Sequence, residues 1–329
     1  MNTNTPGKIR RALRIIVRLL IAVVILIFVI GLILWREPLW VAERLTQVEL
    51  LRAGIHSRST VIDGYNVHYI EGGTGQPVVL IHGLGSQAQN DWGKLAPVLV
   101  RAGYHIYAMD LLGYGRSAKP ADRTYSIFEE TKFVESFLDA NHLAAVDLGG
   151  VSMGGWIAST VALNQPQRVS RLMLFDSAGM WFKPSFDTIL FTPRTSEQVN
   201  QLMALVTPNP KPIPEFVKAD FIRRTQRDGW VVQRALASLM AGADTLDRKF
   251  SALKMPMLIA WGQEDAMTPL SLGESMHRDA PQSVLAVYGG CGHIAVVTCI
   301  DRIAPTVLDF LSGTGQQPGQ TIEIPGHMP

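Results

Sequence analysis

The most apolar part of the chain is its N-terminal segment. Every residue from Leu19 to Trp35 is apolar or glycine, and Ile15 to Val17 extend this run past Arg18 to about 20 residues, which is the length of a helix that crosses a hydrocarbon core of about 30 Å. A cleaved signal peptide would have a shorter apolar core followed by a small-residue cleavage site, whereas Trp35-Arg36-Glu37-Pro38 follows here. The pattern therefore predicts an uncleaved transmembrane helix over residues 15–35.

The charges on the two sides of this apolar run predict its orientation. After the run, Arg36 and Arg44 are offset by Glu37 and Glu43. Positive charge in short flanking segments is typical of the cytoplasmic side. We therefore expect a cytoplasmic N-terminus and a folded body on the far side of the membrane, which would be the periplasm in a bacterium. The basic segment, residues 1–18, has no acidic residue and carries Lys8, Arg10, Arg11, Arg14 and Arg18.

Residues 36–58 form a predicted juxtamembrane linker with an amphipathic helix. Val41, Leu45, Val48 and Leu51 recur at helical spacing, and Trp40 lies beside them. Such a stripe is compatible with a helix lying at the membrane interface or with a helix packed on the folded domain. The sequence pattern alone leaves both alternatives open.

From Ser59 onward, short apolar runs alternate with helical patterns. An Asp63-Gly64 turn between two β-type runs predicts a hairpin. The runs at 77–81, 104–109, 144–151 and 171–175 are predicted strands, and 91–101 and 126–139 are predicted helices. Nearly continuous apolar strands that alternate with helices indicate an α/β fold whose mostly parallel sheet is covered by helices on both faces. We assign residues 59–179 to the first part of this core.

The alternation stops between residues 180 and 250. This stretch is rich in proline, and its helical patterns at 214–228 and 231–240 predict a helical lid inserted at the carboxyl edge of the sheet. The core resumes at 251–312 with strands at 257–261 and 283–288 and a closing helix at 304–312. Residues 313–329 are rich in Gly, Pro and Gln without an apolar period, so they are predicted to form a disordered tail.

Composition adds three points. Hydrophobic residues make up 47% of the 329 residues, which is high for a wholly soluble protein. Removing the five basic charges of residues 1–18 from the net charge of +2 leaves −3 for the rest, so nothing favours nucleic-acid binding. The two cysteines, Cys291 and Cys299, predict neither a disulfide framework nor a metal site, and Cys291 is interpreted as a small packing residue. The two cysteines do not indicate whether the protein lies in an oxidising or a reducing compartment.

The main candidate for chemistry is the segment Gly150-Val151-Ser152-Met153-Gly154, which follows a predicted strand and precedes a predicted helix. In a G-x-S-x-G elbow the turn lifts the serine Oγ above the sheet edge, and the flanking glycines allow strand and helix to approach. Three more residues follow predicted strands, and the carboxyl ends of parallel strands gather at one edge. They are Leu84, Asp265 and His293.

This order of motifs resembles the α/β-hydrolase superfamily from about residue 59 to residue 312. The features that resemble membrane-anchored monoacylglycerol lipases most are the N-terminal span, the Ser-Met-Gly-Gly elbow, Ser177-Ala178-Gly179 and the Cys-Gly-His turn. The superfamily motifs are HGLG at 82–85, DLLGYGRS at 110–117, GVSMGG at 150–155, WGQED at 261–265 and CGH at 291–293.

The resemblance implies a catalytic triad that agrees with general chemistry. A serine hydroxyl is a poor nucleophile near neutral pH, so it needs a base and a group that orients the base. Ser152 would be the nucleophile, His293 the base and Asp265 the orienting acid. The backbone N–H groups of Leu84 and Met153 would form the oxyanion hole.

Several neighbouring residues have other interpretations. Asp176 follows the preceding strand and is an alternative acid, whereas Glu264 is less favoured than Asp265. His82 is interpreted as structural, because it sits beside the oxyanion donors. Asp110 and Arg116 are interpreted as a structural loop pair.

The predicted substrate is a carboxylic ester with an apolar acyl chain, for which the resemblance implies the monoacylglycerol type, and the membrane is the expected partner. Bulky apolar residues in the lid predict an acyl pocket. Hydrolysis of carbon–carbon or amide bonds, and a catalytically silent binding domain, are the alternatives. No metal, cofactor, nucleic acid or obligate protein partner is expected. The predicted pocket residues are Met180, Trp181, Phe182, Phe186, Leu190 and Phe191.

Overall fold

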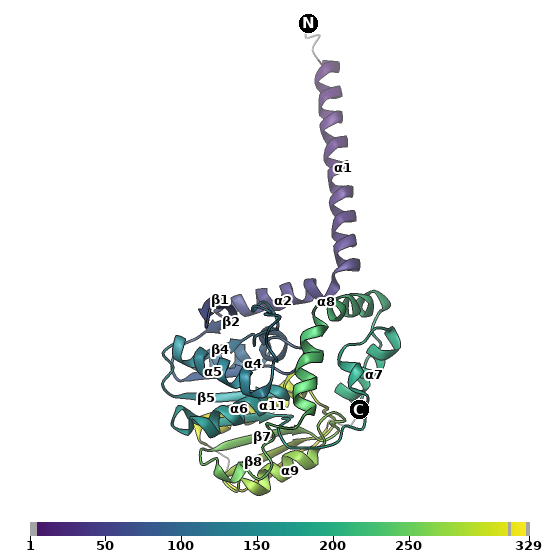
Figure 1. Cartoon of the computed structure of the whole chain (residues 1–329). Helices are drawn as coiled ribbons and strands as arrows, with labels where there is room; N and C mark the ends of the chain where they lie inside the picture. The colour runs from purple at the N-terminus through teal and green to yellow at the C-terminus, as the bar shows by residue number, and fades with distance from the viewer. Residues whose placement is uncertain (1–4, 315–316, 327–329) are drawn as a thin grey trace.

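The computed structural model describes residues 5–314 and 317–326. They form a long N-terminal helix that stands on a body built around one nine-stranded sheet (Figure 1). The strand order is β1-β2-β4-β3-β5-β6-β7-β8-β9. The pairs β1/β2 and β2/β4 are antiparallel, and the pairs from β4/β3 to β8/β9 are parallel. The predicted mostly parallel sheet is confirmed.

The elements follow one another along the chain much as the apolar pattern predicts. The strands are β1 (Ile55–Ile62), β2 (Tyr65–Gly72), β3 (Pro77–Ile81), β4 (His105–Met109), β5 (Val146–Val151), β6 (Val169–Phe175), β7 (Met257–Gly262), β8 (Ser283–Tyr288) and β9 (Thr321–Ile324). The helices are α1 (Thr5–Arg36), α2 (Pro38–Arg52), α3 (Ala88–Trp92), α4 (Leu95–Arg101), α5 (Ile127–Ala140), α6 (Met153–Asn164), α7 (Ser196–Val206), α8 (Glu215–Met240), α9 (Leu270–Asp279), α10 (Ala295–Thr298) and α11 (Ile300–Ser312). Three short 3₁₀ helices are η1 (Pro166–Arg168), η2 (Thr188–Phe191) and η3 (Phe250–Ala252).

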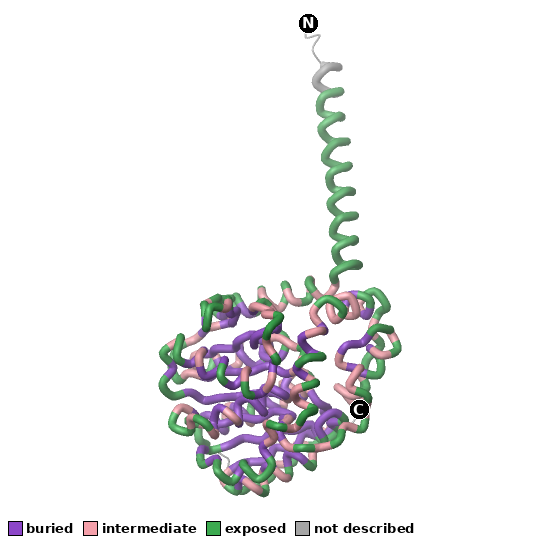
Figure 2. The backbone as a smooth tube through the Cα atoms, viewed as in Figure 1, coloured by how far each residue is buried: buried purple, intermediate pink, exposed green. Residues whose placement is uncertain are grey.

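The central strands are buried on both faces because helices cover each side of the sheet. All six residues of β5 are buried, and buried residues dominate the centre of the body (Figure 2). One hydrophobic cluster joins the sheet to α5 and α6 through residues such as Phe137 and Ile157. A second cluster on the other face includes Leu99 of α4 and Val307 of α11. Continuous apolar strands are therefore stable here, since neither face contacts water.

The N-terminal helix is exposed on all sides. Its stretch Arg10–Arg36 is long and apolar enough to cross a membrane, and no side chain in the most apolar part is buried by the rest of the chain. A soluble protein would bury such a surface, because each apolar side chain left in water costs free energy. Helix α1 is therefore a candidate membrane anchor.

Helix α2 runs across the base of α1 along the body (Figure 1). Three residues of its predicted stripe, Leu45, Val48 and Leu51, are exposed, as is Trp40 beside them, whereas Val41 is half-buried. Leu50 is the one residue of α2 that is buried in the core. The helix therefore packs on the domain through Leu50 and neighbouring side chains, which is one of the two predicted alternatives. Most of the predicted stripe faces away from the domain, and a position at the membrane interface stays a prediction.

Three predicted boundaries differ from the structure. The body begins at Ile55 rather than near Ser59, because β1 extends to the end of the hairpin arm. The predicted helix 91–101 is two helices, α3 and α4, that meet at Gly93, where α2 approaches so closely that a Cβ would lie 2.9 Å from Thr46 Cγ2. The predicted helices 214–228 and 231–240 are one continuous helix, α8. Gly229 lies inside this helix at a point where a Cβ would come within 3.0 Å of Thr192 Cγ2, so the close approach of Thr192 favours glycine there.

Residues 180–250 lie between β6 and β7 and contain η2, α7 and α8 without a strand, so the helical character of this insertion agrees with the prediction. Figure 1 shows α7 and α8 beside the body, with α8 passing the base of α1. We call this segment the helical insertion.

The prediction of a disordered tail over 313–329 is wrong for part of that segment. Thr321–Ile324 forms β9, which pairs in parallel with β8 at the edge of the sheet. The Gly289 N–H donates to the Ile324 carbonyl over 3.0 Å, and Ile322 and Ile324 pack against the second hydrophobic cluster. The Gly, Pro and Gln residues around this four-residue strand hide it in the sequence pattern. The strand forms because β8, at the edge of the sheet, offers it hydrogen-bond partners. Residues 315–316 and 327–329 of the predicted tail lie outside the described residues.

Candidate active site

Ser152 occupies a strained turn between β5 and α6. Its φ of 54° lies in the left-handed region that a serine rarely adopts. A Cβ on Gly150 would lie 2.2 Å from the Gly154 carbonyl oxygen, and a Cβ on Gly154 would lie 2.2 Å from the Ile81 carbonyl oxygen. The two glycines are therefore required by close backbone approach, and the turn presents the Ser152 side chain at the carboxyl edge of the sheet.

The structure brings the three predicted side chains together. Ser152 Oγ lies 2.9 Å from His293 Nε2, and His293 Nδ1 lies 2.9 Å from Asp265 Oδ2. His293 and Asp265 are both buried. This is the chain of contacts by which a histidine can accept a serine proton while a carboxylate fixes its tautomer.

Asp265 is held by its own loop, which begins at the end of β7. Its Oδ1 accepts the backbone N–H groups of Met267 and Thr268 at 2.8 and 2.9 Å, and its Oδ2 accepts the Thr268 hydroxyl at 2.7 Å. Three donors on one carboxylate leave the side chain little freedom. Glu264, the neighbouring acid, is exposed.

Asp176, the alternative acid, has a different function. It is fully buried at the end of β6, where Oδ1 accepts the Gly262 N–H at 2.7 Å and Oδ2 accepts the Ala295 N–H at 2.9 Å. Burial raises the pKa of Asp176 well above its usual range, and the nearby charge of Asp265 adds to the rise. Asp176 thus joins the acid loop to the histidine loop, and it has no hydrogen bond to His293 in the described part of the chain.

The predicted oxyanion donors lie at two loop ends. Met153 is the first residue of α6, where backbone N–H groups have no partner within the helix. Leu84 lies in the loop after β3. Among residues 5–314 and 317–326, neither the Leu84 N–H nor the Met153 N–H donates to another group. Both donors are therefore available to a developing negative charge.

Asp91 is a site residue that the sequence analysis missed. It is buried in α3, and its Oδ2 accepts the Gly83 N–H at 2.9 Å while Oδ1 accepts the Ser86 hydroxyl at 2.5 Å. Burial raises the pKa of Asp91, although the nearby His82 acts against the rise. Asp91 therefore fixes the turn on both sides of Leu84. The only signal in the sequence was an acid soon after the HGLG motif, which a helix start would explain equally well.

His82 is structural, as predicted. Its Nε2 accepts the Leu111 N–H at 3.0 Å, so the proton is on Nδ1, which donates to the Gly83 carbonyl over 2.8 Å. Both ring nitrogens are thus occupied. His82 holds the oxyanion loop against the loop that follows β4.

Asp110 and Arg116 form a structural loop pair, as predicted, but through the arginine backbone. Arg116 contributes only its backbone N–H to Asp110, at 2.9 Å, whereas its guanidinium donates to Ser57. Asp110 instead lies 2.7 Å from the buried His68. Although burial acts to raise the pKa of Asp110, the hydrogen bond and charge of His68 lower it overall. Spacing in the sequence could not reveal His68 because it comes from another strand.

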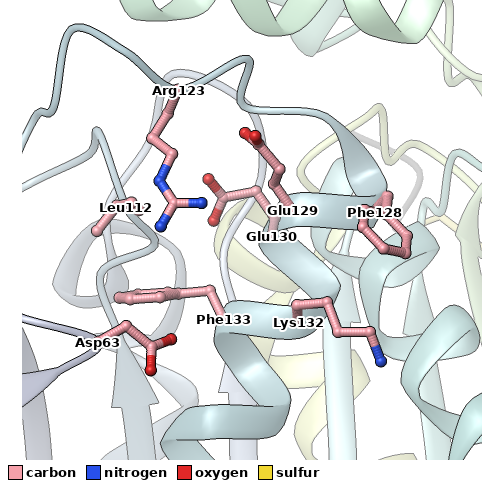
Figure 3. A pocket seen from close by; sticks show the side chains of 8 residues that line it. All are labelled: Asp63, Leu112, Arg123, Phe128, Glu129, Glu130, Lys132 and Phe133. Atoms are coloured by element: carbon pink, nitrogen blue, oxygen red, sulfur yellow. The ribbon is translucent and has the colours of Figure 1, made fainter.

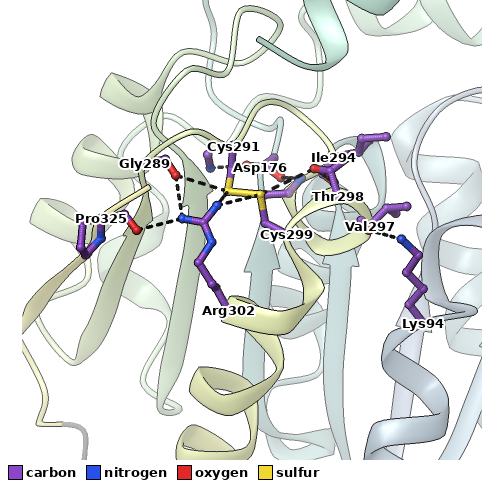
Figure 4. The surroundings of a disulfide bond; sticks show 12 residues. Lys94, Asp176, Gly289, Cys291, Ile294, Val297, Thr298, Cys299, Arg302 and Pro325 are labelled. Carbon is purple, nitrogen blue, oxygen red and sulfur yellow. Dashed lines mark hydrogen bonds between the residues drawn. A yellow bond between two sulfur atoms is a disulfide. The ribbon is translucent and has the colours of Figure 1, made fainter. Parts of the chain in front are cut away.

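The cysteine prediction is also wrong. Cys291 and Cys299 form a disulfide that closes a short loop containing His293. Figure 4 shows Arg302 reaching the two sulfur atoms and the carbonyl groups of Gly289 and Pro325. Two cysteines in 329 residues form no recognisable framework, and only the turn before α11 brings their Cα atoms within 6.3 Å.

The structure places some of the predicted acyl-pocket residues in or against the hydrophobic core and leaves one of them exposed. Leu190 is buried, and Met180, Phe182 and Phe191 pack against the cluster that contains Met153. Phe186 contacts Phe191 edge-to-face, with ring centroids 5.9 Å apart. Trp181 is 68% exposed and does not line an enclosed pocket.

Two cavities lie away from the serine. One, of about 180 Å³, lies beside α5, where Arg123 and Glu130 face each other (Figure 3). Burial raises the pKa of Glu130 well above its usual range. The other, of about 350 Å³, lies between η2 and α8. The first cavity is lined by Asp63, Leu112, Arg123, Phe128, Glu129, Glu130, Lys132 and Phe133, and the second by Thr192, Arg194, Thr225, Gln226, Gly229, Trp230 and Gln233.

Comparison with known proteins agrees with this geometry. A family profile described as "alpha/beta hydrolase fold" matches residues 76–211. Lipase 1 of Psychrobacter immobilis is 28% identical over 285 residues, which cover 82% of this chain and 88% of the lipase. A 2-hydroxymuconate semialdehyde hydrolase of Pseudomonas sp. (strain CF600) is 27% identical over 276 residues, which cover 80% of this chain and 93% of that hydrolase.

A solved structure of a membrane phospholipase A, described as a bacterial virulence factor, matches with a TM-score of 0.76 at 27% identity. The match covers 90% of this chain and 98% of the phospholipase chain. The chain has the α/β-hydrolase fold, and its resemblance to lipase-type hydrolases is confirmed.

Proposed function

We propose that this chain is a membrane-anchored serine hydrolase that cleaves carboxylic esters with apolar acyl chains. The observation that carries the proposal is the continuous contact from Ser152 through His293 to Asp265, with two free backbone donors nearby. Similarity to Lipase 1 and to a membrane phospholipase A supports an ester or lipid substrate. A single-chain lipid such as a monoacylglycerol fits an anchored enzyme, because the anchor holds the site where such molecules partition.

The proposed reaction begins with attack of Ser152 Oγ on the ester carbonyl carbon. His293 Nε2 accepts the serine proton, and Asp265 stabilises the resulting imidazolium. The N–H groups of Leu84 and Met153 hold the oxyanion, and each donor of this kind contributes about 3 kcal/mol in comparable sites. His293 then gives its proton to the leaving alcohol. Water, activated by the same histidine, hydrolyses the acyl-enzyme and restores the Ser152 hydroxyl.

Labelling with a fluorophosphonate probe tests the activated serine. We expect one adduct per chain, which mass spectrometry of the full-length protein locates on Ser152, because an activated serine forms a stable covalent adduct at phosphorus. A panel of para-nitrophenyl esters should then show turnover that rises with acyl length over several carbons. A well-folded protein that gains no adduct would contradict the proposal.

A second candidate reaction has one specific observation in its favour. The similarity to 2-hydroxymuconate semialdehyde hydrolase supports the alternative of carbon–carbon bond cleavage by an enzyme of the same fold. The ester panel separates the two candidates. Labelling of Ser152 without ester turnover at any chain length would favour carbon–carbon or amide cleavage over ester hydrolysis.

Two features support a body located outside the cytoplasm. The basic residues in the first turns of α1, before its apolar stretch, favour a cytoplasmic N-terminus. The disulfide between Cys291 and Cys299 belongs to an oxidising compartment, because cytosolic thiols are kept reduced. The exposed Trp40 and Leu45 on α2 lie next to the anchor, where amphipathic helices bind the membrane surface, and they support contact with the membrane on whichever side the body lies.

A topology experiment checks this orientation. Alkaline phosphatase fused to the C-terminus should be active in a bacterial host, because it folds only after export, and Cys291 and Cys299 should resist alkylation until a reductant is added. A cytoplasmic reporter, such as green fluorescent protein, serves as the reciprocal control. If the green fluorescent protein fusion is fluorescent and both cysteines are alkylated without a reductant, the topology is the opposite of the proposed one.

A further inference from the structure

A buried carboxylate connects the helical insertion to the junction between α1 and α2. Asp220, in α8, is 1% exposed, and its Oδ2 accepts the Leu39 N–H at 3.1 Å. Leu39 lies in the first turn of α2, where backbone N–H groups have no partner within the helix. A carboxylate at this position stabilises the helix start by hydrogen bonding and by its charge. The chain therefore uses a residue 181 positions away to cap α2.

Two arginines of α8 extend this connection. Arg223 lies 3.2 Å from Asp220 and donates to the Arg36 carbonyl at the last residue of α1. Arg224 lies 3.4 Å from Asp220 and donates to Glu43 of α2 over 2.7 Å. We call Arg36, Leu39, Glu43, Asp220, Arg223 and Arg224 the anchor clamp. Through this cluster, α8 binds the last carbonyl of α1, at Arg36, and an N–H group in the first turn of α2, at Leu39.

The anchor clamp also reaches the loop that carries Leu84. Gln87 donates to the Glu43 carboxylate over 3.1 Å, and Gln89 donates to the Glu43 carbonyl over 3.3 Å. Gln87 immediately follows Ser86, which Asp91 holds. Glu43 thus contacts both α8 and the segment next to the proposed oxyanion hole.

The other half of α8 packs on the active-site loops. Val231 and Val232 are buried in the cluster that contains Met153, and Val232 is the nearest neighbour that a Cβ on Gly85 would meet, at 3.7 Å. Asp220 and Val232 are 12 residues apart in α8, so at 1.5 Å per residue at most about 18 Å of helix separates the anchor contacts from the oxyanion-loop contact. Figure 1 shows that α8 bends along its course, and this one continuous helix contacts both the membrane anchor and the oxyanion loop.

We infer that the anchor clamp positions α8 and the Leu84 loop relative to the membrane surface, so that an acyl chain leaving the bilayer enters beside α8. This inference rests on the proposed ester hydrolysis and adds positioning residues for substrates that reside in a membrane. A water-soluble ester reaches Ser152 by diffusion and does not need this alignment. Loss of the clamp should therefore affect membrane-borne substrates selectively.

The test compares two substrates with full-length protein in the same phosphatidylcholine vesicles. Asp220→Asn keeps the side-chain shape but removes the charge that pairs with the two arginines. We expect turnover of a long-chain monoacylglycerol in the vesicles to fall about 10- to 100-fold, the effect of a misplacement of roughly 1 Å, while para-nitrophenyl butyrate hydrolysis changes less than about twofold. Glu43→Gln, a milder change, should shift the ratio of the two rates in the same direction.

Arg227→Gln is the matched control, because Arg227 lies on the same helix, is exposed and pairs with its neighbour Asp228. It should leave both rates unchanged. An equal loss on both substrates with Asp220→Asn would indicate a role in stability alone, and unchanged vesicle turnover would also overturn the inference.

Hydrogen–deuterium exchange in the same vesicles gives a readout that does not depend on turnover. Asp220→Asn should accelerate exchange in the first turn of α2 and, at a distance, in residues 83–87. Acceleration confined to α8 would overturn the inference even if the wild type hydrolysed no ester. A wild type that is inactive on both substrates but shows the coupled exchange would instead contradict the proposed function and leave the clamp in place.

Discussion

Replacing Ser152 by alanine is expected to lower kcat for a soluble carboxylic ester by about 10⁶-fold. The hydroxyl oxygen 2.9 Å from His293 Nε2 is the only group at this point of the elbow that can form the acyl-enzyme. The free N–H groups of Leu84 and Met153 would remain, so a residual rate above that in water is expected from oxyanion stabilisation and binding. Initial rates with para-nitrophenyl butyrate, measured on detergent-solubilised full-length protein, check this expectation.

Ser159→Ala is the matched control for the serine experiment. Ser159 is buried in α6, the same helix that Ser152 precedes, and its hydroxyl donates to the Gly155 carbonyl over 2.9 Å. Its loss removes one hydrogen bond within α6, which contributes about 1 kcal/mol to stability, and leaves the contacts of Ser152 in place. The rate should therefore change by less than about threefold. A Ser152→Ala protein that keeps more than a few per cent of wild-type activity would show that another group performs the reaction.

The second large effect is expected from Asp265→Asn, which should lower kcat by about 10⁴-fold with little loss of fold. An asparagine amide can donate to His293 Nδ1 and would hold the imidazole in the wrong tautomer, with its proton on Nε2 facing Ser152. The hydrogen bonds from Met267 and Thr268 can still be accepted by the amide oxygen. Steady-state rates and the rate of fluorophosphonate labelling should fall together.

Asp176→Asn separates the two buried acids. Asp176 accepts N–H groups from Gly262 and Ala295 and has no hydrogen bond to His293 among the described residues, so its replacement should lower the thermal midpoint while kcat stays within about tenfold of wild type. Since burial already raises the pKa of Asp176, an uncharged amide is a modest electrostatic change. A 10⁴-fold loss with Asp176→Asn and a small loss with Asp265→Asn would reverse the assignment.

The sequence alone determined the features that depend on residues near one another in the chain. The apolar run before Arg36 predicts a helix long enough to cross a membrane, because length and composition decide that property. Strand and helix patterns predict a parallel α/β sheet, because burial on both faces requires continuous apolar strands. The spacing around Ser152 predicts the elbow, since the glycines are required by contacts within a few residues. The order of Ser152, Asp265 and His293 follows from motifs of the same local kind.

The tertiary structure decided what depends on residues far apart in the chain. Strand β9 forms because β8 offers an open edge, the disulfide forms because a turn brings Cys299 back to Cys291, and the exposed side of α2 is set by what Leu50 packs against. Asp91 and Asp220 look like ordinary helix residues in the sequence. Each gains its role from a backbone N–H supplied by another element, eight residues away for Gly83 and 181 for Leu39. No local period encodes such pairings, because they arise only when the elements pack.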